Sequence, residues 1–433
     1  MADKTRDNAN AEAARTLLEK NRRIFEGDRT LWIIYTVLLV VSILVVYSST
    51  AKMAYDISSR MTTTDSLRQQ IMFVVLAIPT IFIVHKIDYK VFMRLTPLFY
   101  YIFIALTIAT YFIGTTTNGA ARWIAIGPIQ FQPSEGLKIL TILMLARRME
   151  SRQGNINKIN LLPTSWRLSD PKQQRIIREN TIPLLGPIIL SCLVIVPAHT
   201  STAVLIFLVS IVMLYIGRVR LKELVKFTLL KELVKFTLIL GTVGVLGLGA
   251  MSMVGMGRGD TAGGRLSTWA NEWLGDDTVN ASYELSDTQR AMIAIRNGGL
   301  FGEGAGHSTS RAVVIHPESD YAYAFFLSEY GLIIGLILML LYLWVFFRSM
   351  EICKKCKTAF PALMTMGLGL LITCQALLHI FVQVNIIPET GQTLPLISRG
   401  GTSLLFTTLA FGMIISVSRT NQLREENERN KSR

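Results

Sequence analysis

Long apolar runs separated by short polar segments constrain this chain more than any other feature of its sequence. A helix that spans a bilayer needs ~20 mostly apolar residues, because its length must match the hydrocarbon core. Of the 433 residues, 51% are hydrophobic, and the runs follow one another along the chain. We therefore predict an all-α polytopic membrane protein with about ten transmembrane helices, at residues 31–49, 70–86, 97–114, 133–147, 182–197, 200–217, 233–256, 320–347, 361–386 and 400–418.

The net charge of +14 lies mainly in the polar segments between these runs. With ten spans, the basic clusters all fall on one side of the membrane, and the positive-inside rule makes that side cytoplasmic. Both termini are then cytoplasmic, and the charge reflects membrane topology. We expect no nucleic-acid partner. The basic clusters lie in the N-terminal tail, the C-terminal tail and segments 85–96, 147–181, 218–231 and 348–357.

The expected domain organisation is one membrane domain, residues 30–419, between two cytoplasmic tails, residues 1–29 and 420–433. Its longest extracytoplasmic loop, residues 257–319, joins the predicted seventh and eighth spans and contains the glycine-rich segment NGGLFGEGAG. Long loops on a compact helical domain commonly carry function. The nonapeptide LKELVKFTL occurs at 221–229 and again at 230–238. It suits a helix along the membrane surface, or it is a local duplication without a role.

Two charged residues weaken the prediction of the fourth span and suggest a site. Pro133 suits the first turn of a helix, where Glu135 is favoured by the helix dipole. Lys138 follows on nearly the same face. The two charges can neutralise each other at the membrane boundary, or Lys138 and the nearby Arg122 can bind an anionic lipid headgroup. Both interpretations remain open.

The segment 386–403, IIPETGQTLPLISRGGTS, joins the last two predicted spans. It is an ordinary outer loop, or a re-entrant segment buried in protein, where irregular backbone is tolerated. Its apolar residues favour the second interpretation. Its Gly400–Gly401 pair would let backbone N–H groups approach a ligand closely.

Acidic residues stand at the start of the eighth span, in HPESDYAYAFFLSEYG, residues 316–331. Asp320 can cap the helix, or it can serve as a base at the lip of a cavity, where apolar surroundings raise a carboxyl pKa. Glu329 lies nine residues further on, about 13 Å along a continuous helix and on its opposite face. The two are therefore not a close carboxylate pair, and Glu329 is expected to be an internal structural partner.

Five segments occur in a distinctive order: GAARWI (119–124), FQPSEGLK (131–138), SDTQRAMIAIRNGGLFGEGAGHS (286–308), PESDYAYAFFLSEYG (317–331) and QTLPLISRGGTS (392–403). Together they resemble the SEDS family of shape, elongation, division and sporulation proteins, FtsW, RodA and SpoVE, over roughly residues 30–420. The resemblance implies a ten-span peptidoglycan glycosyltransferase of the bacterial cytoplasmic membrane. Such enzymes polymerise lipid II beside a class B penicillin-binding protein transpeptidase, among other proteins of the division machinery.

The resemblance also implies roles for individual residues. The essential Asp of the family falls on Asp320, which is then the catalytic residue. The substrate-binding motifs fall on Arg122, Glu135, Lys138, Arg399, Gly400 and Gly401, and the acidic span residue falls on Glu329. This chain has Arg399 where the family usually has tyrosine, and His199 where a common motif has Asp.

The implied reaction begins with Asp320 as general base on the GlcNAc 4-hydroxyl of one lipid-linked saccharide. That oxygen attacks the anomeric carbon of the other saccharide with inversion, and undecaprenyl pyrophosphate leaves. Arg122 and Lys138 would stabilise the leaving group. A divalent cation such as Mg²⁺ or Mn²⁺ could assist, although no metal-binding motif in the sequence demands one.

Other function classes fit part of the same pattern. A lipid II flippase would also need many spans and intramembrane charges, but transporters often contain repeats of several helices, which the sequence lacks. A division scaffold would not need Asp320. Within the family, the charged N-terminal tail and the Ser-Asp-Tyr sequence favour a septal, FtsW-like protein over an elongation-type, RodA-like one.

Overall fold

The computed structural model describes residues 25–50, 63–117, 120–127, 129–154, 156, 170–219, 269 and 285–432. These residues form long helices and one small sheet. The helices are α2 (Arg29–Thr50), α3 (Thr63–Val84), α4 (Tyr89–Ile113), α5 (Pro133–Glu150), α6 (Pro171–Ile176), α7 (Ile182–Ile195), α8 (Thr200–Ile216), α12 (Asp287–Gly298), α13 (Ala322–Lys354), α14 (Ala359–Gln383) and α15 (Thr402–Lys431). A π-helical turn, Ile177–Thr181, joins α6 to α7, and a 3₁₀ turn, Thr309–Ala312, precedes α13.

Each predicted apolar run coincides with a helix, except run 233–256, which lies outside the described residues. Within the described part of the chain, 7 helices are long and apolar enough to cross a membrane. Helix α8 is apolar but shorter, and α5 carries several charges. The structure is thus that of a multi-pass membrane protein, while ten spans stay a prediction. The repeated nonapeptide and most of loop 257–284 also lie outside the described residues.

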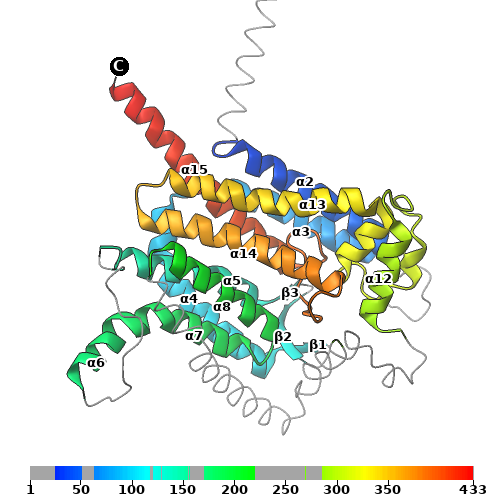
Figure 1. The fold of residues 1–433 in the computed structure, drawn as a ribbon, viewed down its shortest axis with the longest axis horizontal. Coiled ribbons are helices and arrows are strands. Elements are labelled where there is room, and N and C mark those ends of the chain that lie inside the picture. Colours follow the sequence, from blue (N-terminus) through cyan, green and yellow to red (C-terminus); the bar gives the residue numbers. More distant parts are fainter. Residues whose placement is uncertain are drawn as a thin grey trace, which may run out of the picture.

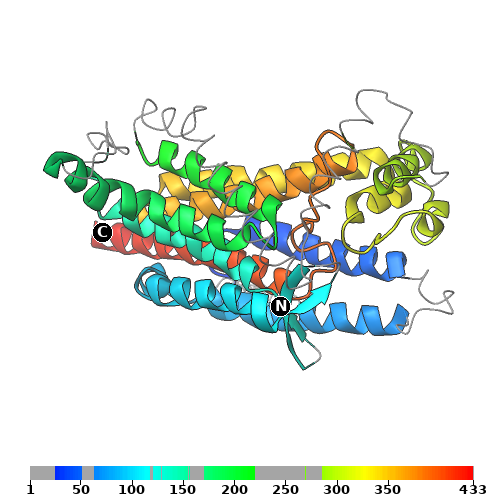
Figure 2. The same ribbon diagram turned by 90° about the horizontal axis from the view of Figure 1, so that it is seen from below.

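The long helices run side by side along the long axis of the molecule (Figures 1 and 2). Helix α14 is largely buried and packs against α13, α5, α8 and α15. Helix α12 and the strands lie toward one end of the bundle, whereas α6 and the C-terminal end of α15 lie toward the other. The described parts of the predicted extracytoplasmic loop and of the predicted cytoplasmic segments are therefore at opposite ends.

The outer helices expose apolar side chains that a water-soluble protein would bury. In α4, Leu98 is 59% exposed, and in α13, Leu340 and Trp344 are 56% and 50% exposed. An apolar surface of this kind is stable when lipid covers it. The exposed faces therefore mark the lipid-contacting side of the bundle.

A three-stranded antiparallel sheet connects α4 to α5. Its strands, β1 (Thr115–Thr117), β2 (Ala120–Ile126) and β3 (Ile129–Phe131), pair in sequence order. Thr115 lies opposite Trp123, and Ile124 lies opposite Phe131. The sheet places Arg122 on its central strand, next to the start of α5.

Helix α13 is broken at Gly331, whose φ of 77° and ψ of 172° are not helical. The loop after α12 satisfies the backbone groups that the break exposes. Leu332 N donates to Gly299 O at 3.0 Å, and Gly304 N donates to Glu329 O at 3.0 Å. Unpaired backbone groups are costly away from water, so this loop makes the break possible. A continuous helix from Asp320 to beyond Glu329, as expected from the sequence, ends instead at this glycine.

Candidate functional site

A cavity of about 510 Å³ lies where the sheet, the loop before α13 and the segment between α14 and α15 meet. It is lined by Gln69, Gln70, Phe73, Arg122, Trp123, Gln130, Gln132, Glu135, His199, His316, Glu318, Ser319, Asp320, Gly391, Gln392, Thr393, Arg399, Gly400 and Gly401. Most of these side chains are polar. The cavity therefore suits a hydrophilic or charged ligand group, and it brings together most of the site residues predicted from the sequence.

Asp320 is half-buried and lines this cavity. It lies two residues before the start of α13 at Ala322. Its backbone is held on both sides. Gln383 Nε2 of α14 donates to Asp320 O at 2.8 Å, and Ser398 Oγ donates to Ser319 O at 2.8 Å. Arg399 N donates to Glu318 O at 2.7 Å. These contacts from two distant segments fix the backbone position from which the carboxylate enters the cavity.

The turn before Asp320 depends on His316, a non-glycine residue with φ of 51°. Its carbonyl oxygen accepts from Ser319 N at 3.1 Å and from Tyr321 N at 3.3 Å. A left-handed conformation is unfavourable for a histidine, and such residues cluster at functional sites. The turn folds the chain back so that Asp320 faces the cavity.

An ion pair accompanies this turn, with His316 Nδ1 3.8 Å from Glu318 Oε1. The Glu318 carboxylate raises the pKa of His316 above its ordinary value, although partial burial opposes the shift. Burial disfavours the charged form of Glu318, but His316 and the Arg399 guanidinium outweigh it, so the pKa of Glu318 lies below its ordinary value. Each group therefore favours the charged form of the other, beside Asp320.

Arg122 enters the cavity from the sheet and contacts His199, which directly precedes α8. The distance from Arg122 Nη1 to His199 Nε2 is 3.0 Å. Arg122 Nε is buried and has no hydrogen-bond partner among the described residues. A guanidinium group only donates hydrogen bonds, and the Arg122 side chain lines the cavity, so it suits an anionic group there.

The second arginine of the cavity, Arg399, belongs to the segment between α14 and α15. Its Nη2 donates to Gln69 Oε1 of α3 at 2.8 Å. Gly400 and Gly401 line the cavity beside it, and Gly401, with φ of 52°, directly precedes α15. Leu394 and Ile397 of the same segment are fully buried. The segment is therefore buried in protein, in agreement with the re-entrant interpretation rather than with an ordinary outer loop.

Glu135 lines the cavity, whereas Lys138 lies behind it. Lys138 Nζ is 2.8 Å from Glu135 Oε1 and donates to Gln375 Oε1 at 2.9 Å. Ser403 Oγ donates to Glu135 Oε2 at 2.9 Å. Lys138 is 2% exposed and lines a separate cavity of about 20 Å³. The neutralising ion pair is thus present, and a direct contact of Lys138 with substrate stays a prediction.

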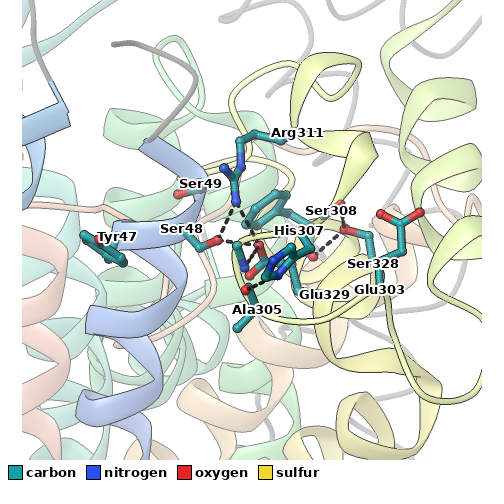
Figure 3. Close-up of polar contacts among 12 residues, drawn as sticks. Tyr47, Ser48, Ser49, Glu303, Ala305, His307, Ser308, Arg311, Ser328 and Glu329 are labelled. Atoms are coloured by element: carbon teal, nitrogen blue, oxygen red, sulfur yellow. Dashed lines mark hydrogen bonds and ion pairs between the residues drawn. The ribbon is translucent and has the colours of Figure 1, made fainter. Parts of the chain in front are cut away.

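Glu329 lies outside the cavity, in a buried polar network that joins three segments (Figure 3). Its Oε1 accepts from Ser48 Oγ of α2, from Gly306 N at 2.9 Å and from Arg311 Nη2 at 3.3 Å. The network ties the loop after α12 to α2 and α13. Its role as an internal structural partner stays a prediction, which these contacts make testable.

Several cavity residues carried no clear signal in the sequence. Gln69 and Gln70 lie within α3, just before its apolar stretch, where they resemble polar residues at a span boundary. His199 stood out only as a difference from a family motif. No group of three His, Cys, Asp or Glu residues in the described ranges is arranged to hold a metal ion.

The model of the FtsW, RodA and SpoVE cell cycle proteins matches residues 28–423. The chain belongs to this family. It is 26% identical over 399 residues to stage V sporulation protein E of Bacillus subtilis (strain 168), covering 90% of this chain and 97% of that protein. It is 27% identical to a probable peptidoglycan glycosyltransferase FtsW of Nitrosococcus halophilus (strain Nc4), covering 81% of this chain and 82% of that protein.

Solved structures share the fold. A chain from a study of polymerization and crosslinking by a peptidoglycan synthase complex superposes with a TM-score of 0.60 at 18% identity, covering 91% of this chain and 98% of that one. The rod shape determining protein RodA of Thermus thermophilus superposes with a TM-score of 0.55 at 19% identity, covering 91% of this chain and 97% of that one. The expectation of a SEDS family member is confirmed.

Proposed function

We propose that this protein is a peptidoglycan glycosyltransferase that polymerises lipid II into glycan strands. The observation that carries the proposal is the shared cavity, in which the carboxylate of Asp320 and the guanidinium groups of Arg122 and Arg399 line one polar space. A glycosyl transfer with a pyrophosphate leaving group needs a base for the acceptor hydroxyl and cationic donors for the departing anion. Curated relatives named as probable peptidoglycan glycosyltransferases support the same activity.

In this proposal the acceptor is the 4-hydroxyl of the terminal GlcNAc of one lipid-linked saccharide. Asp320 removes its proton as the oxygen attacks the anomeric carbon of the second saccharide. The bond from that carbon to the diphosphate oxygen breaks, the configuration inverts, and undecaprenyl pyrophosphate leaves. The carboxyl group of Asp320 then returns the proton to solvent.

The arginines supply the electrostatic part of this mechanism. Negative charge grows on the diphosphate as the glycosidic bond breaks. Arg122 and Arg399 both line the cavity, where their guanidinium groups can donate to that charge. Glu135, which lines the cavity, is held in place by its ion pair with Lys138 and by a hydrogen bond from Ser403. Charge-assisted hydrogen bonds preorganised in this way lower the barrier because they do not have to reorient during the reaction.

The proposed setting is the bacterial cytoplasmic membrane, with ten spans, cytoplasmic tails at 1–29 and 420–433, and the 257–319 loop outside. The proposed partner is a class B penicillin-binding protein, together with other proteins of the division complex. The structural similarity to a component of a peptidoglycan synthase complex supports such a partner. We assign the activity to septal synthesis because FtsW and SpoVE proteins are prominent among the relatives; an elongation role is the alternative within the family.

The decisive experiment supplies purified protein, in detergent, with lipid II alone and with its partner transpeptidase. A polymerase forms glycan strands there, which are resolved by gel electrophoresis. A lipid II flippase forms none, because detergent micelles have no second leaflet and transport leaves the substrate unchanged. Complete absence of strands with the partner present contradicts the proposed function.

A further inference from the structure

The contact between His199 and Arg122 fixes the protonation state of the His199 ring. The 3.0 Å contact joins His199 Nε2 to Arg122 Nη1, and a guanidinium nitrogen only donates hydrogen bonds. His199 Nε2 must therefore accept, which requires that it carry no proton.

The other ring nitrogen is held by Ser201. His199 Nδ1 lies 3.4 Å from Ser201 Oγ. The Ser201 hydroxyl donates to Thr390 O at 2.7 Å, so its oxygen remains an acceptor for an N–H on Nδ1. The network thus selects the neutral Nδ1–H tautomer of His199. Because both ring nitrogens contact protein atoms, neither is directed at a ligand.

We propose that His199 is the positioning residue of Arg122. As a neutral acceptor it takes one guanidinium N–H and so holds the Arg122 side chain at the cavity, where the guanidinium can bind a phosphate group. The inference rests on the proposed function only in its choice of ligand, a diphosphate. His199 is 8% exposed, so its contact with Arg122 is sheltered from competing water.

Protonation of His199 would break this arrangement. An imidazolium has no lone pair on Nε2, and it would place a positive charge against the guanidinium. Arg122 would then lose its anchor, and the cavity would bind a diphosphate less tightly at acid pH. The other charged or titratable groups of the cavity are Glu135, His316, Glu318, Asp320 and Arg399, and Glu389 adjoins Thr390 on the segment packed against Ser201.

The test compares wild type with His199→Gln and His199→Met in the full-length protein. The Gln side chain places an amide oxygen near the position of Nε2, so it keeps an acceptor for Arg122 but does not titrate. The Met side chain has similar bulk without a comparable acceptor. The probe is inorganic pyrophosphate, and its affinity for detergent-solubilised protein is measured by calorimetry between about pH 8 and about pH 5.5, a range that brackets the ordinary His pKa of about 6.5.

At about pH 8 we expect His199→Gln to bind within about twofold of wild type and His199→Met to bind about tenfold more weakly, since hydrogen bonds to charged groups have about this effect. As the pH falls, the wild-type affinity should decrease relative to that of His199→Gln, toward the about tenfold loss expected for His199→Met, because protonated His199 offers Arg122 no acceptor. The protonation of pyrophosphate and of the other cavity groups is common to both proteins and cancels in the ratio.

Three results would overturn the proposal: a wild-type to Gln ratio that does not change with pH, a wild-type affinity that rises at acid pH relative to Gln, or no pyrophosphate binding by wild type at about pH 8. The second would make protonated His199 a direct anion ligand. Because the readout is binding, it is independent of glycan synthesis. If the affinities behave as expected but no glycan strands form, only the proposed function is contradicted. If strands form but the affinities do not behave as expected, only this inference is contradicted.

Discussion

Replacement of Glu329 by alanine should be among the most destabilising single substitutions in this protein. The Glu329 side chain is fully buried and accepts hydrogen bonds from Ser48, Gly306 N and Arg311 (Figure 3). Glu329→Ala leaves these donors unpaired. Breaking a buried ion pair costs about 3–5 kcal/mol. The Arg311 side chain is 21% exposed and can recruit water, so the lower end, about 3 kcal/mol, applies.

Two further variants show whether the loss of stability comes from the buried hydrogen-bond network. Glu329→Gln keeps the shape and one acceptor oxygen, and should cost about 1 kcal/mol. Glu303 is the matched control, because this carboxylate of the same loop is half-exposed and accepts from Thr309 N at 2.6 Å and from Thr309 Oγ1 at 2.9 Å. Loss of such a capping contact costs about 1 kcal/mol.

The assay is the thermal unfolding midpoint of each purified variant in one detergent. We expect Glu329→Ala to lower the midpoint about three times as much as Glu329→Gln or Glu303→Ala. If Glu329→Ala and Glu303→Ala lower it equally, burial and partner number do not set the cost, and the reasoning is refuted.

Two other substitutions test the loop around the site. Gly331→Ala should lower the thermal midpoint more than Gly127→Ala: both positions have positive φ, but an added Cβ would lie 2.4 Å from Leu300 O at Gly331 and would meet nothing within 4 Å at Gly127. Equal effects would contradict the close approach of the loop to the broken helix. Glu318→Gln removes the partner of His316. Because the pKa of His316 is raised, its contribution to stability is present at low pH and is lost as the pH rises through the raised value. Because the pKa of Glu318 is lowered, its contribution is present above the ordinary value of 4.5 and is lost as the pH falls below it. The midpoint difference between wild type and Glu318→Gln should therefore be largest near pH ~6 and shrink at both extremes, and a difference that does not vary with pH contradicts the ion pair.

Much of the helical architecture could be predicted from the sequence because span length and apolarity are local properties. The break at Gly331 could not. A glycine within an apolar run is equally compatible with close helix packing. The break depends on two hydrogen bonds to residues distant in sequence: Gly299 O accepts from Leu332 N, and Gly304 N donates to Glu329 O. The re-entrant segment was predictable because its buried Leu394 and Ile397 are too apolar for an exposed loop.

The candidate site was predictable in its residues more than in its geometry. Asp320 and Arg122 share one cavity, as the family motifs imply. Lys138 lies behind the wall instead, because α5 directs it toward Gln375 of α14. Spacing along a helix shows that Glu135 and Lys138 are neighbours but not which of them faces a cavity. The contact of His199 with Arg122 joins residues 77 positions apart and has no local signature.

The central claim, that Asp320 acts as the base of a glycosyl transfer, is tested most directly with purified Asp320→Asn protein supplied with lipid II and its partner transpeptidase. A general base contributes ~10²–10⁴-fold to rate, and the amide is nearly isosteric but cannot accept the proton. We predict an unchanged thermal midpoint, retained lipid II binding and a loss of strand formation within that range. Strand formation at the wild-type rate by Asp320→Asn would contradict the account.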